Sequence, residues 1–382
     1  MSTSFLFQLP TKVHYGFGKI NELTNLPYDV KRAFIVTDKG VLNAGLLEDV
    51  QSLLKQQDIS FEVYSEIEPD PSVETVDKAA LAYKNSECDF LIAVGGGSPI
   101  DTAKGIRVVA SNGGSIRDYA GINLVKEEPT IPFIALPTTS GTGSEVTIFA
   151  VFSDWEENRK VTVTSSYLAP NISIVDPKLT MTAPASITAA SGFDAFAHAA
   201  ETFVSRIAQP ASDALALSAM KTASKYLRRA VYEGSDVEAR SKMAEASLLA
   251  GIAFNQSYLG LAHAIGSAIS GHAHVSHGVT IGLLLPSVME FNLAARLDKY
   301  EQLGEVLFDT SNLSGREIGF KVVEEVRNLR NDIGLPQTLR EVNVGEHQLA
   351  DIAKDSVKSG MWKFNPREAS VAQIKRLLKE IY

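Results

Sequence analysis

One helical stretch of the sequence carries a carboxylate and an imidazole four residues apart, Asp194 and His198. Side chains at this spacing lie on the same face of a helix, with Cβ atoms about 5–6 Å apart. Two further histidines, His263 and His277, follow downstream, so one carboxylate and three imidazoles could close around a single divalent metal. Because no thiolate is involved, this set suits Fe(II), Zn(II) or a neighbouring first-row ion.

The residues around the Asp194–His198 pair favour a buried site. An isolated Asp-x-x-x-His pair is more often a surface pair or a capped core histidine than a metal site. Here the flanking positions are mostly alanine, too small and apolar for a solvated helix face. We therefore expect Asp194 to be buried, and a buried carboxylate needs a partner charge or a metal. The alternative for the histidine-rich run 271–278 is a polar loop that binds metal only adventitiously.

Composition and charge narrow the class of protein. A chain of 382 residues predicts two domains, and 45% hydrophobic with 21% charged residues is ordinary for a soluble globular enzyme. The net charge of −9 argues against a nucleic-acid or anionic-membrane partner. The densest basic spot, formed by Lys225, Arg228 and Arg229, is explained by a solvated helix face. With Cys88 as the only cysteine, disulfides and a cysteine-based zinc site are excluded.

Targeting and membrane signals are missing from the sequence. The N-terminal residues lack both the basic segment and the apolar run of a signal peptide. We find no apolar stretch of the ~18 residues that a membrane span requires. These features predict a cytoplasmic protein without a membrane partner.

The first half of the chain alternates strand and helix signals. Apolar runs at 33–37, 61–64, 90–94 and 131–136 read as strands, with helices expected at 46–57, 73–84 and 99–111. Continuous apolar strands that alternate with helices imply a mainly parallel sheet covered on both faces. Shorter strands around 147–152, 160–164 and 172–175 are expected to extend this sheet.

After Pro184 the pattern becomes helical up to the C-terminus. We therefore expect a Rossmann-like α/β dinucleotide-binding domain over 1–180 and an all-helical metal-binding domain over 181–382, with a site in the cleft between them. The helices are expected to break at six prolines and glycines. These are Pro210, Gly234, Gly260, Pro286, Gly315 and Pro336.

A glycine-rich turn, Gly95-Gly96-Gly97-Ser98, follows the third strand and opens a helix at Pro99. Glycines there let the backbone approach an anion, and the first N–H groups of the helix point at it. The turn is neither the G-x-G-x-x-G fingerprint nor a Walker A motif, and alone it could be a plain tight turn. Its strand–turn–helix context favours phosphate binding. Asp101 and Lys104 lie on the first turns of the same helix.

A second polar loop, residues 137–145, leaves the next strand with two glycines and with hydroxyl side chains that include Thr138, Thr139, Ser140 and Thr142. Such donors at the strand ends of a parallel sheet lie where ligands bind, although a flexible surface loop is the alternative. Asp38 ends the first strand. A carboxylate there could hydrogen-bond an adenosine ribose and repel the extra phosphate of NADP.

Taken together, these stretches resemble the iron-containing (group III) alcohol dehydrogenase family over nearly the whole chain. The resemblance rests on residues 95–104, 137–147, 191–201 and 260–286, and on Asn365-Pro366-Arg367-Glu368-Ala369 near the C-terminus. It implies a nucleotide-binding α/β domain, a helical domain and a metal in the cleft.

The resemblance also implies roles for individual residues. Asp194, His198, His263 and His277 would be the metal ligands. Asp38 matches the position associated with preference for NAD over NADP. Gly95, Gly96, Gly97 and Ser98 would hold the pyrophosphate, and Asp101 on the following helix would also belong to the cofactor site. The remaining cofactor-binding residues would be Thr138, Thr139 and Thr142 on the nicotinamide side, Lys160 at the phosphates or ribose, and Asp70 and Ser72 at the adenosine.

The substrate side departs from the family pattern at one position. Many relatives carry a histidine four residues after His263, and here that residue is Ser267. Phe149 and Phe254 are expected to narrow the substrate pocket, and Trp362 to cap it. His272 or His274 could replace the missing histidine, although positions behind the ligands or at the surface fit them better.

The expected activity is interconversion of a short-chain primary alcohol or diol and its aldehyde, by hydride transfer to NAD, in a homodimer or larger homo-oligomer. One alternative is an NADPH-preferring aldehyde reductase of the same family. A second is a metal- and NAD-dependent lyase of the dehydroquinate synthase type, which needs basic residues near the ligands for an anionic substrate. A third is a non-catalytic binding protein with a degenerate site.

Overall fold

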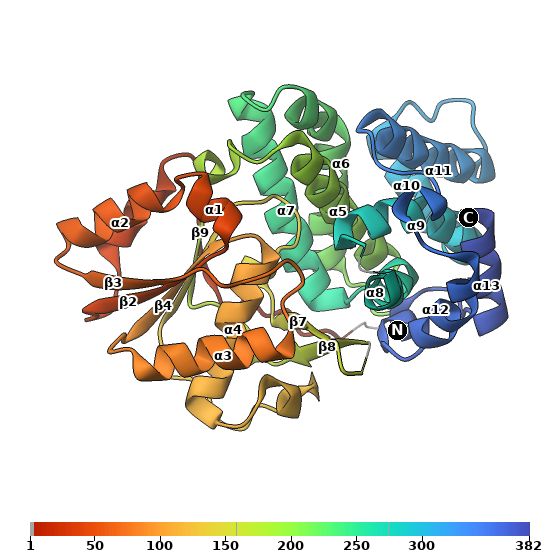
Figure 1. Ribbon diagram of the computed structural model, residues 1–382. Helices are drawn as coiled ribbons and strands as arrows, with labels where there is room; N and C mark the ends of the chain where they lie inside the picture. Colours follow the sequence, from red (N-terminus) through yellow and green to blue (C-terminus); the bar gives the residue numbers. More distant parts are fainter. Residues whose placement is uncertain (1–3, 158, 274) are drawn as a thin grey trace. The chain divides into compact units, whose positions relative to one another are not determined.

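The computed structural model describes residues 4–157, 159–273 and 275–382. The chain divides into two compact units. One is Leu9–Ala183, and the other is Pro184–Tyr382 together with the described residues that precede Leu9. The first unit is built from a parallel sheet with helices, and the second is mostly helical (Figure 1), which confirms the predicted fold class.

The first unit contains a six-stranded sheet in the order β1-β9-β6-β4-β2-β3, and every neighbouring pair is parallel. β2, β3, β4 and β6 match the four predicted strands, while the N-terminal strand β1 was not predicted. The strands are β1 (Lys12–Tyr15), β2 (Arg32–Val36), β3 (Ser60–Tyr64), β4 (Phe90–Gly95), β6 (Phe133–Pro137) and β9 (Ile172–Val175).

Helices cover both faces of this sheet. Successive side chains of a strand point to opposite faces, and the strands are apolar throughout, so both faces carry apolar side chains that must be buried. Ala33 and Ile35 of β2 belong to the core that α2 (Leu47–Gln56) covers. Phe34 and Val36 belong to the core on the other face, under α3 (Val73–Asn85) and α4 (Gly97–Asn112). Figure 1 shows α2 and α3 on opposite sides of the strands. A short helix α1 (Lys39–Asn43) follows β2.

The sequence predicted the positions of the three shorter strands in the chain, but it predicted the correct sheet for only one of them. β9 joins the parallel sheet, but β7 (Phe149–Asp154) and β8 (Arg159–Thr164) pair with each other antiparallel and form a separate sheet with β5 (Gly121–Ile122). Extension of the main sheet was therefore wrong for β7 and β8. Their inward residues, among them Phe152 and Val163, pack into the core beside α4, where they bury apolar surface without joining the parallel strands.

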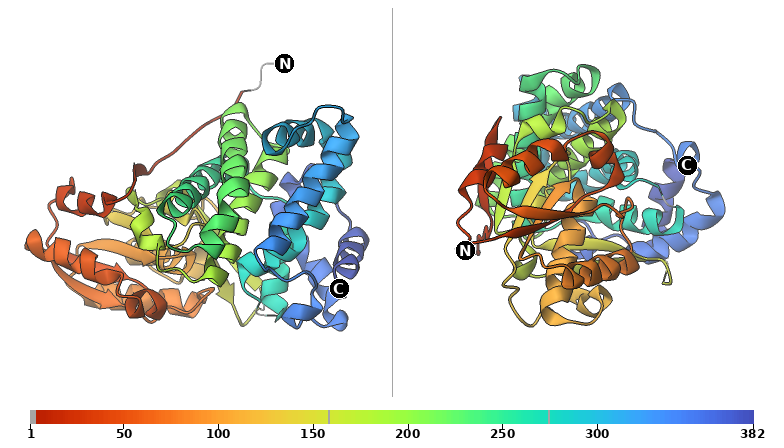
Figure 2. Two further views of the ribbon diagram at one scale, coloured as in Figure 1. Left: turned by 90° about the horizontal axis from the view of Figure 1, so that it is seen from above. Right: turned by 60° about the vertical axis from the view of Figure 1, so that its left-hand side comes forward.

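The second unit is a set of packed helices whose first three, α5 to α7, all contact one another (Figure 2, green). A Cβ at Gly192 of α5 would lie 2.3 Å from Cδ1 of Leu227, so glycine allows α5 and α6 to approach closely. The helices are α5 (Ala185–Val204), α6 (Pro210–Tyr232), α7 (Val237–Ser257), α8 (Leu261–Ala273), α9 (His277–Asn292), α10 (Leu297–Leu307), α11 (Gly315–Asp332), α12 (Leu349–Ser356) and α13 (Val371–Glu380).

Four of the six expected helix breaks fall at or within two residues of a helix end, Pro336 lies in the loop that follows α11, and Pro286 lies inside a helix. α9 continues through Pro286, although a proline in a helix interior removes one backbone hydrogen bond. Its neighbours Leu285 and Val288 are almost completely buried, and this apolar burial offsets the lost bond.

The expectation that the chain has no apolar segment long enough to span a membrane was wrong for the segment that begins with α9. The 19 residues His277–Ala295 reach a mean hydropathy of 1.4 and pass that test by length and composition. The window is 67% buried inside the structure, and a core helix of a soluble protein passes the same test. One such helix is therefore weak evidence for a membrane span.

A fully buried lysine ties α4 to the loop that follows β6. The Lys104 ammonium donates to Ser144 Oγ (2.8 Å), Thr147 Oγ1 (3.2 Å) and the Phe149 carbonyl (2.5 Å). It also pairs with Asp101 at 3.3 Å. Glu145, on the same loop, is 2% exposed, and burial raises its pKa to about 7 although Lys104 acts in the opposite direction.

The raised pKa of Glu145 predicts a pH-dependent stability. Ionising this carboxyl is harder in the folded chain than at the ordinary pKa of 4.5, so the folded state loses stability as pH rises from about 4.5 to about 7. Glu145→Gln stays neutral and should raise the unfolding free energy above about pH 7 by on the order of 3 kcal/mol. Urea unfolding across pH measures this, with the exposed Glu324→Gln as control. A gain that does not shrink towards pH 4.5 would contradict the assignment.

Candidate functional site

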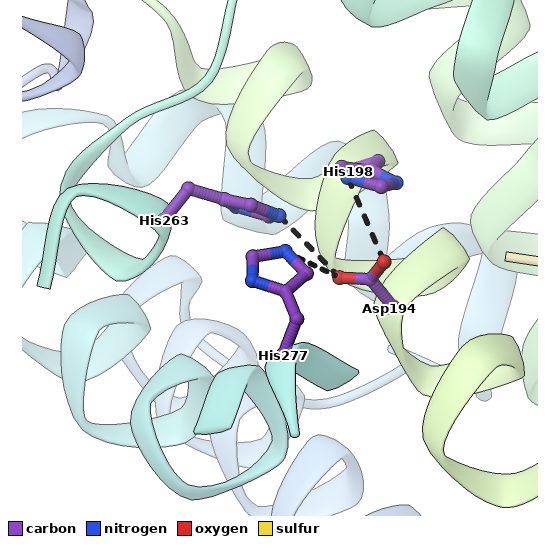
Figure 3. Close-up of side chains that lie close together, drawn as sticks. All are labelled: Asp194, His198, His263 and His277. Atoms are coloured by element: carbon purple, nitrogen blue, oxygen red, sulfur yellow. Dashed lines mark ion pairs between the residues drawn. The ribbon is translucent and has the colours of Figure 1, made fainter. Parts of the chain in front are cut away.

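Three helices of the second unit bring together the carboxylate and the three imidazoles singled out from the sequence. Asp194 and His198 lie on α5, His263 on α8 and His277 at the first residue of α9. One candidate ligand atom from each lies within 4.8 Å of all the others. Figure 3 shows the three rings around the Asp194 carboxylate.

The distances within this cluster leave room for a cation. Asp194 Oδ2 is 3.8 Å from His198 Nε2, and Oδ1 is 3.4 Å from His263 Nε2 and 3.7 Å from His277 Nε2. Asp194 Oδ1 and His263 Nε2 are buried polar atoms without a hydrogen-bond partner in the described structure. Buried polar groups in folded proteins are almost always satisfied, so two such atoms beside each other fit a site that binds a cation. One oxygen and three imidazole nitrogens fit a first-row divalent metal.

Aromatic packing holds the imidazole rings. The His198 ring stacks on His263 at a centroid distance of 4.7 Å and on Phe254 at 4.8 Å. Phe254 is itself 7% exposed, so the ring of His198 has little freedom to turn. The packing thus limits where the ring nitrogens can point.

A second buried carboxylate, Glu201 of α5, orients His263. Its Oε2 lies 2.6 Å from His263 Nδ1 and accepts the Gly260 N–H at 2.9 Å, while Oε1 accepts the Ala262 N–H at 2.6 Å. A carboxylate behind a metal-binding histidine fixes the tautomer in which the other nitrogen is free for the metal. The sequence reasoning missed Glu201, although its position three residues after His198 on an apolar helix was a usable signal.

Asn365 holds the start of α8 beside Glu201. Its Oδ1 accepts the Leu261 N–H at 3.3 Å, and its side chain exchanges two hydrogen bonds with Asn292, of 2.8 and 2.7 Å. The C-terminal stretch that begins at Asn365 therefore has a structural role at the start of α8, close to the candidate metal ligands.

The electrostatics of the cluster favour positive charge. Burial alone would raise the pKa of Asp194, but the imidazoles of His198, His277 and His263 outweigh it and lower that pKa. Burial alone would lower the pKa of His263, yet Asp194 and Glu201 raise it to about 9. The two carboxylates therefore attract either a proton or a metal cation to this position.

The glycine-rich turn lies at the point of the parallel sheet where the strand order reverses. β2 has β3 on one side and β4 on the other, and ligands of such sheets bind outside the carboxyl ends of the strands at this point. Asp38 follows β2, and Gly96 follows β4. Thr37 joins the two strand ends through a hydrogen bond of 2.8 Å from its Oγ1 to the Val94 carbonyl.

Close contacts require the glycines of this turn. An added Cβ would lie 2.4 Å from Pro99 Cγ at Gly95 and 2.9 Å from Thr142 Cγ2 at Gly97. At Gly96 it would meet Thr139 Oγ1 at 3.2 Å. The two polar loops predicted from the sequence therefore pack against each other, and the Thr138 N–H donates to the Gly95 carbonyl at 3.0 Å.

Several of the other predicted cofactor residues form one polar group. Lys160 pairs with Asp70 at 3.1 Å, and the Asp70 N–H donates to Ser98 Oγ at 3.3 Å. Ser72 caps α3, and Asp38 caps α1 by accepting the Val41 N–H at 2.9 Å.

Asp101 is engaged by the protein itself. Its carboxylate accepts from the Ser144 hydroxyl and from the Val151 N–H and pairs with Lys104. Asp101 is therefore part of the buried hydrogen-bond network around Lys104. Its contact with a cofactor stays a prediction.

The expected substrate residues are spread over both units. Phe254 contacts His198, and Ser267 lies on α8 one helical turn after His263. Trp362 donates from Nε1 to the Val357 carbonyl at 2.7 Å, and Phe149 begins β7. The roles of these four residues in a substrate pocket stay predictions.

The other two histidines of the 271–278 run, His272 and His274, were expected either behind the ligands or at the surface. His272 pairs with Asp355 at 2.7 Å, which joins α8 to α12 and explains this histidine without a catalytic role. His274 lies outside the described residues.

A parallel sheet with a glycine-rich loop at its strand reversal, and a helical unit with a buried carboxylate–imidazole cluster, are expected of metal-dependent oxidoreductases. Residues 10–177 match the model of the iron-containing alcohol dehydrogenase family, and residues 188–382 match its C-terminal part. The NAD-dependent methanol dehydrogenase of Bacillus methanolicus is 36% identical, with 98% of each chain aligned. The 1,3-propanediol dehydrogenase of Klebsiella pneumoniae is also 36% identical, over 92% of each chain.

A solved structure of a 1,3-propanediol oxidoreductase covers the whole chain and is itself fully covered, with a TM-score of 0.95 and 34% identity. The chain belongs to the iron-containing alcohol dehydrogenase family. It is an alcohol–aldehyde oxidoreductase, and this assignment leaves the lyase and non-catalytic alternatives without support.

The structure predicts that Glu201 controls metal affinity without contacting the metal. Glu201→Gln keeps the shape of the side chain but weakens the contact with His263 Nδ1, so metal affinity should fall about 10–100-fold. Competition with a chelator followed by metal analysis measures this, with the exposed Glu324→Gln as control. Unchanged metal affinity in Glu201→Gln would show that His263 is not oriented by this carboxylate.

Proposed function

We propose that this protein interconverts a short-chain primary alcohol or diol and its aldehyde with NAD, and that Asp194, His198, His263 and His277 bind the iron. One observation carries the ligand assignment: four candidate ligand atoms lie within 4.8 Å of one another, and two of them are buried without a partner. Membership of an iron-containing family supports Fe(II) over Zn(II).

The protein's own residues prepare this centre in three ways. Glu201 holds His263 so that Nε2 faces the cluster, Phe254 fixes the plane of His198, and burial removes competing water from Asp194. A divalent metal bound there would supply a Lewis acid that polarises the alcohol or carbonyl oxygen.

The dinucleotide is assigned to the first unit. Gly95, Gly96 and Gly97 would admit the pyrophosphate to the backbone N–H groups at the start of α4, which carry the positive end of the helix dipole. Thr138, Thr139 and Thr142 would line the nicotinamide side, and Asp70 and Lys160 the ribose or phosphates. Asp38, at the end of β2, favours NAD because its charge would repel the 2′-phosphate of NADP.

The relatives narrow the substrate class. The methanol and 1,3-propanediol dehydrogenases act on small primary alcohols or diols by name, and Phe254 places a bulky ring beside the candidate metal centre. We extend the proposal to a cytoplasmic homo-oligomer. The single cysteine suits a reducing compartment, and β1 leaves an edge of the parallel sheet that a second copy can extend.

The proposal is tested with anaerobically reconstituted protein without metal, with Fe(II) and with Zn(II), assayed on short alcohols, diols and aldehydes with NAD(H). Asp194→Ala and His263→Ala should lose activity and most of the metal. Both should still bind NADH, because the residues assigned to NADH belong to the other unit. Metal analysis and NADH fluorescence titration provide the readouts, with the exposed His347→Ala as control. Wild-type turnover in both variants would overturn the ligand assignment.

Cofactor preference is tested at Asp38. Asp38→Asn removes the charge, while an asparagine at this position can still cap α1. The ratio of kcat/KM for NADP to that for NAD should rise about tenfold or more, which corresponds to ~1.4 kcal/mol of relieved repulsion. The exposed Asp29→Asn serves as control. An unchanged ratio would mean that another residue sets the preference, and a wild-type preference for NADPH would favour the reductase alternative.

A further inference from the structure

The helical unit contains a cavity of about 340 Å³ that the proposed activity does not use. Residues of α5, α6, α10 and α11 form it, and α6, α10 and α11 lie side by side in Figure 1. Its lining consists of Phe196, Lys221, Ser224, Lys225, Arg228, Val306, Leu307, Glu325, Val326 and Leu329.

The cavity is separate from the candidate metal centre. None of the four candidate metal ligands lines it. Phe196 lies two residues after Asp194 and two before His198 on α5, and positions two apart on a helix do not share a face. Phe196 therefore points away from the side of α5 that carries the candidate ligands.

The floor of the cavity is apolar. Phe196 and Val326 are each 1% exposed, and Leu329 is 2% exposed. Val306 and Leu307, which are partly buried, complete the apolar lining. A ligand with a short hydrocarbon chain would remove further apolar surface from water here.

The α6 side of the cavity is basic. Lys221, Lys225 and Arg228 follow one another at spacings of four and three residues, which places three cations along one face of the helix. Like charges at these spacings destabilise a helix, and an anion placed between them relieves the repulsion. Lys221 and Lys225 are exposed, as expected for a solvated basic face, and together with Arg228 they also border the cavity. The Lys225 ammonium lies 4.9 Å from the centre of the Tyr226 ring, and Arg229 pairs with Asp236 and Glu238.

The nearby acids leave part of this charge uncompensated. Arg228 pairs with Asp332 at 2.8 Å. Within the described ranges, neither Lys221 nor Lys225 has a carboxylate oxygen within the 4.0 Å of an ion pair. Glu325 is the one acid among the described lining residues, so the lining carries three cations against one anion.

We propose that this cavity binds a small anionic amphiphile, a carboxylate with a short aliphatic chain. Lys221 and Lys225 would hold the carboxylate through charge-assisted hydrogen bonds, and the chain would lie against Phe196, Val326 and Leu329. The volume is at the lower end of the ~300–1,000 Å³ of small-molecule sites, which suits a short chain and excludes a dinucleotide.

Isothermal titration calorimetry of octanoate into the metal-loaded, full-length protein tests this site. Octylammonium, with the same chain and the opposite charge, is the chemical control. Lys221→Gln with Lys225→Gln removes the charges, and Ser224→Phe fills the cavity while both lysines remain. Lys375→Gln with Lys379→Gln is the matched control, because these exposed lysines have the same spacing on α13 and do not line the cavity.

Octanoate should bind with one site per chain, and octylammonium should not. The lysine variant should weaken octanoate binding about tenfold or more, since each lost charge-assisted bond is worth about that factor. Ser224→Phe should weaken it by a similar factor because the phenyl ring takes the space of the hydrocarbon chain, and the α13 variant should leave binding unchanged. No binding of octanoate to the wild-type protein would overturn the proposal. Binding that neither cavity variant weakens, but that a chelator abolishes, would place octanoate at the metal centre and would overturn it as well.

Discussion

The burial of two carboxylates against the histidines of the helical unit is the constraint on which the rest of that unit depends. Asp194 and Glu201 both lie inside the unit, and both have a pKa below their ordinary values although burial acts in the opposite direction. An ionised group in such a place costs several kcal/mol unless it is compensated. With neutral imidazoles the two carboxylates carry two negative charges, which a divalent cation balances. The close packing of α5, α8 and α9 therefore serves the charge balance of the candidate centre as much as the hydrophobic core.

The sheet unit depends on a different feature, the turn at the carboxyl ends of its parallel strands, which is where ligands of such sheets bind. Glycines at the turn after β4 let the polar loop that follows β6 pack directly against this turn. Lys104 of α4 hydrogen-bonds to the same polar loop and so holds it against α4. The residues assigned to the cofactor thus rest on a rigid support of buried hydrogen bonds. The same unit places Asp38 just after β2, beside the reversal of strand order, where its carboxylate caps α1.

Sequence patterns predicted the main strands, most helices and the four candidate ligands, because these depend on local periodicity and on residue type. They failed where the outcome depended on distant packing. β7 and β8 have strand signals, but only the core beside α4 decides that they form a separate sheet. Pro286 looks like a helix end, yet buried neighbours keep α9 continuous. Glu201 was overlooked because its partner His263 is 62 residues away and on another helix.

The sequence by itself determined that a carboxylate and an imidazole share one helix face, that a glycine-rich turn joins a buried strand to a helix, and that the family is the iron-containing alcohol dehydrogenases. These are properties of spacing and residue type, which survive without knowledge of any long-range contact. Only the tertiary structure decided that His263 and His277 converge on Asp194, that Glu201 stands behind His263, and that basic residues of α6 border an apolar cavity. Each of these depends on how helices far apart in the chain pack, because side chains on different helices meet only when their apolar faces are buried together.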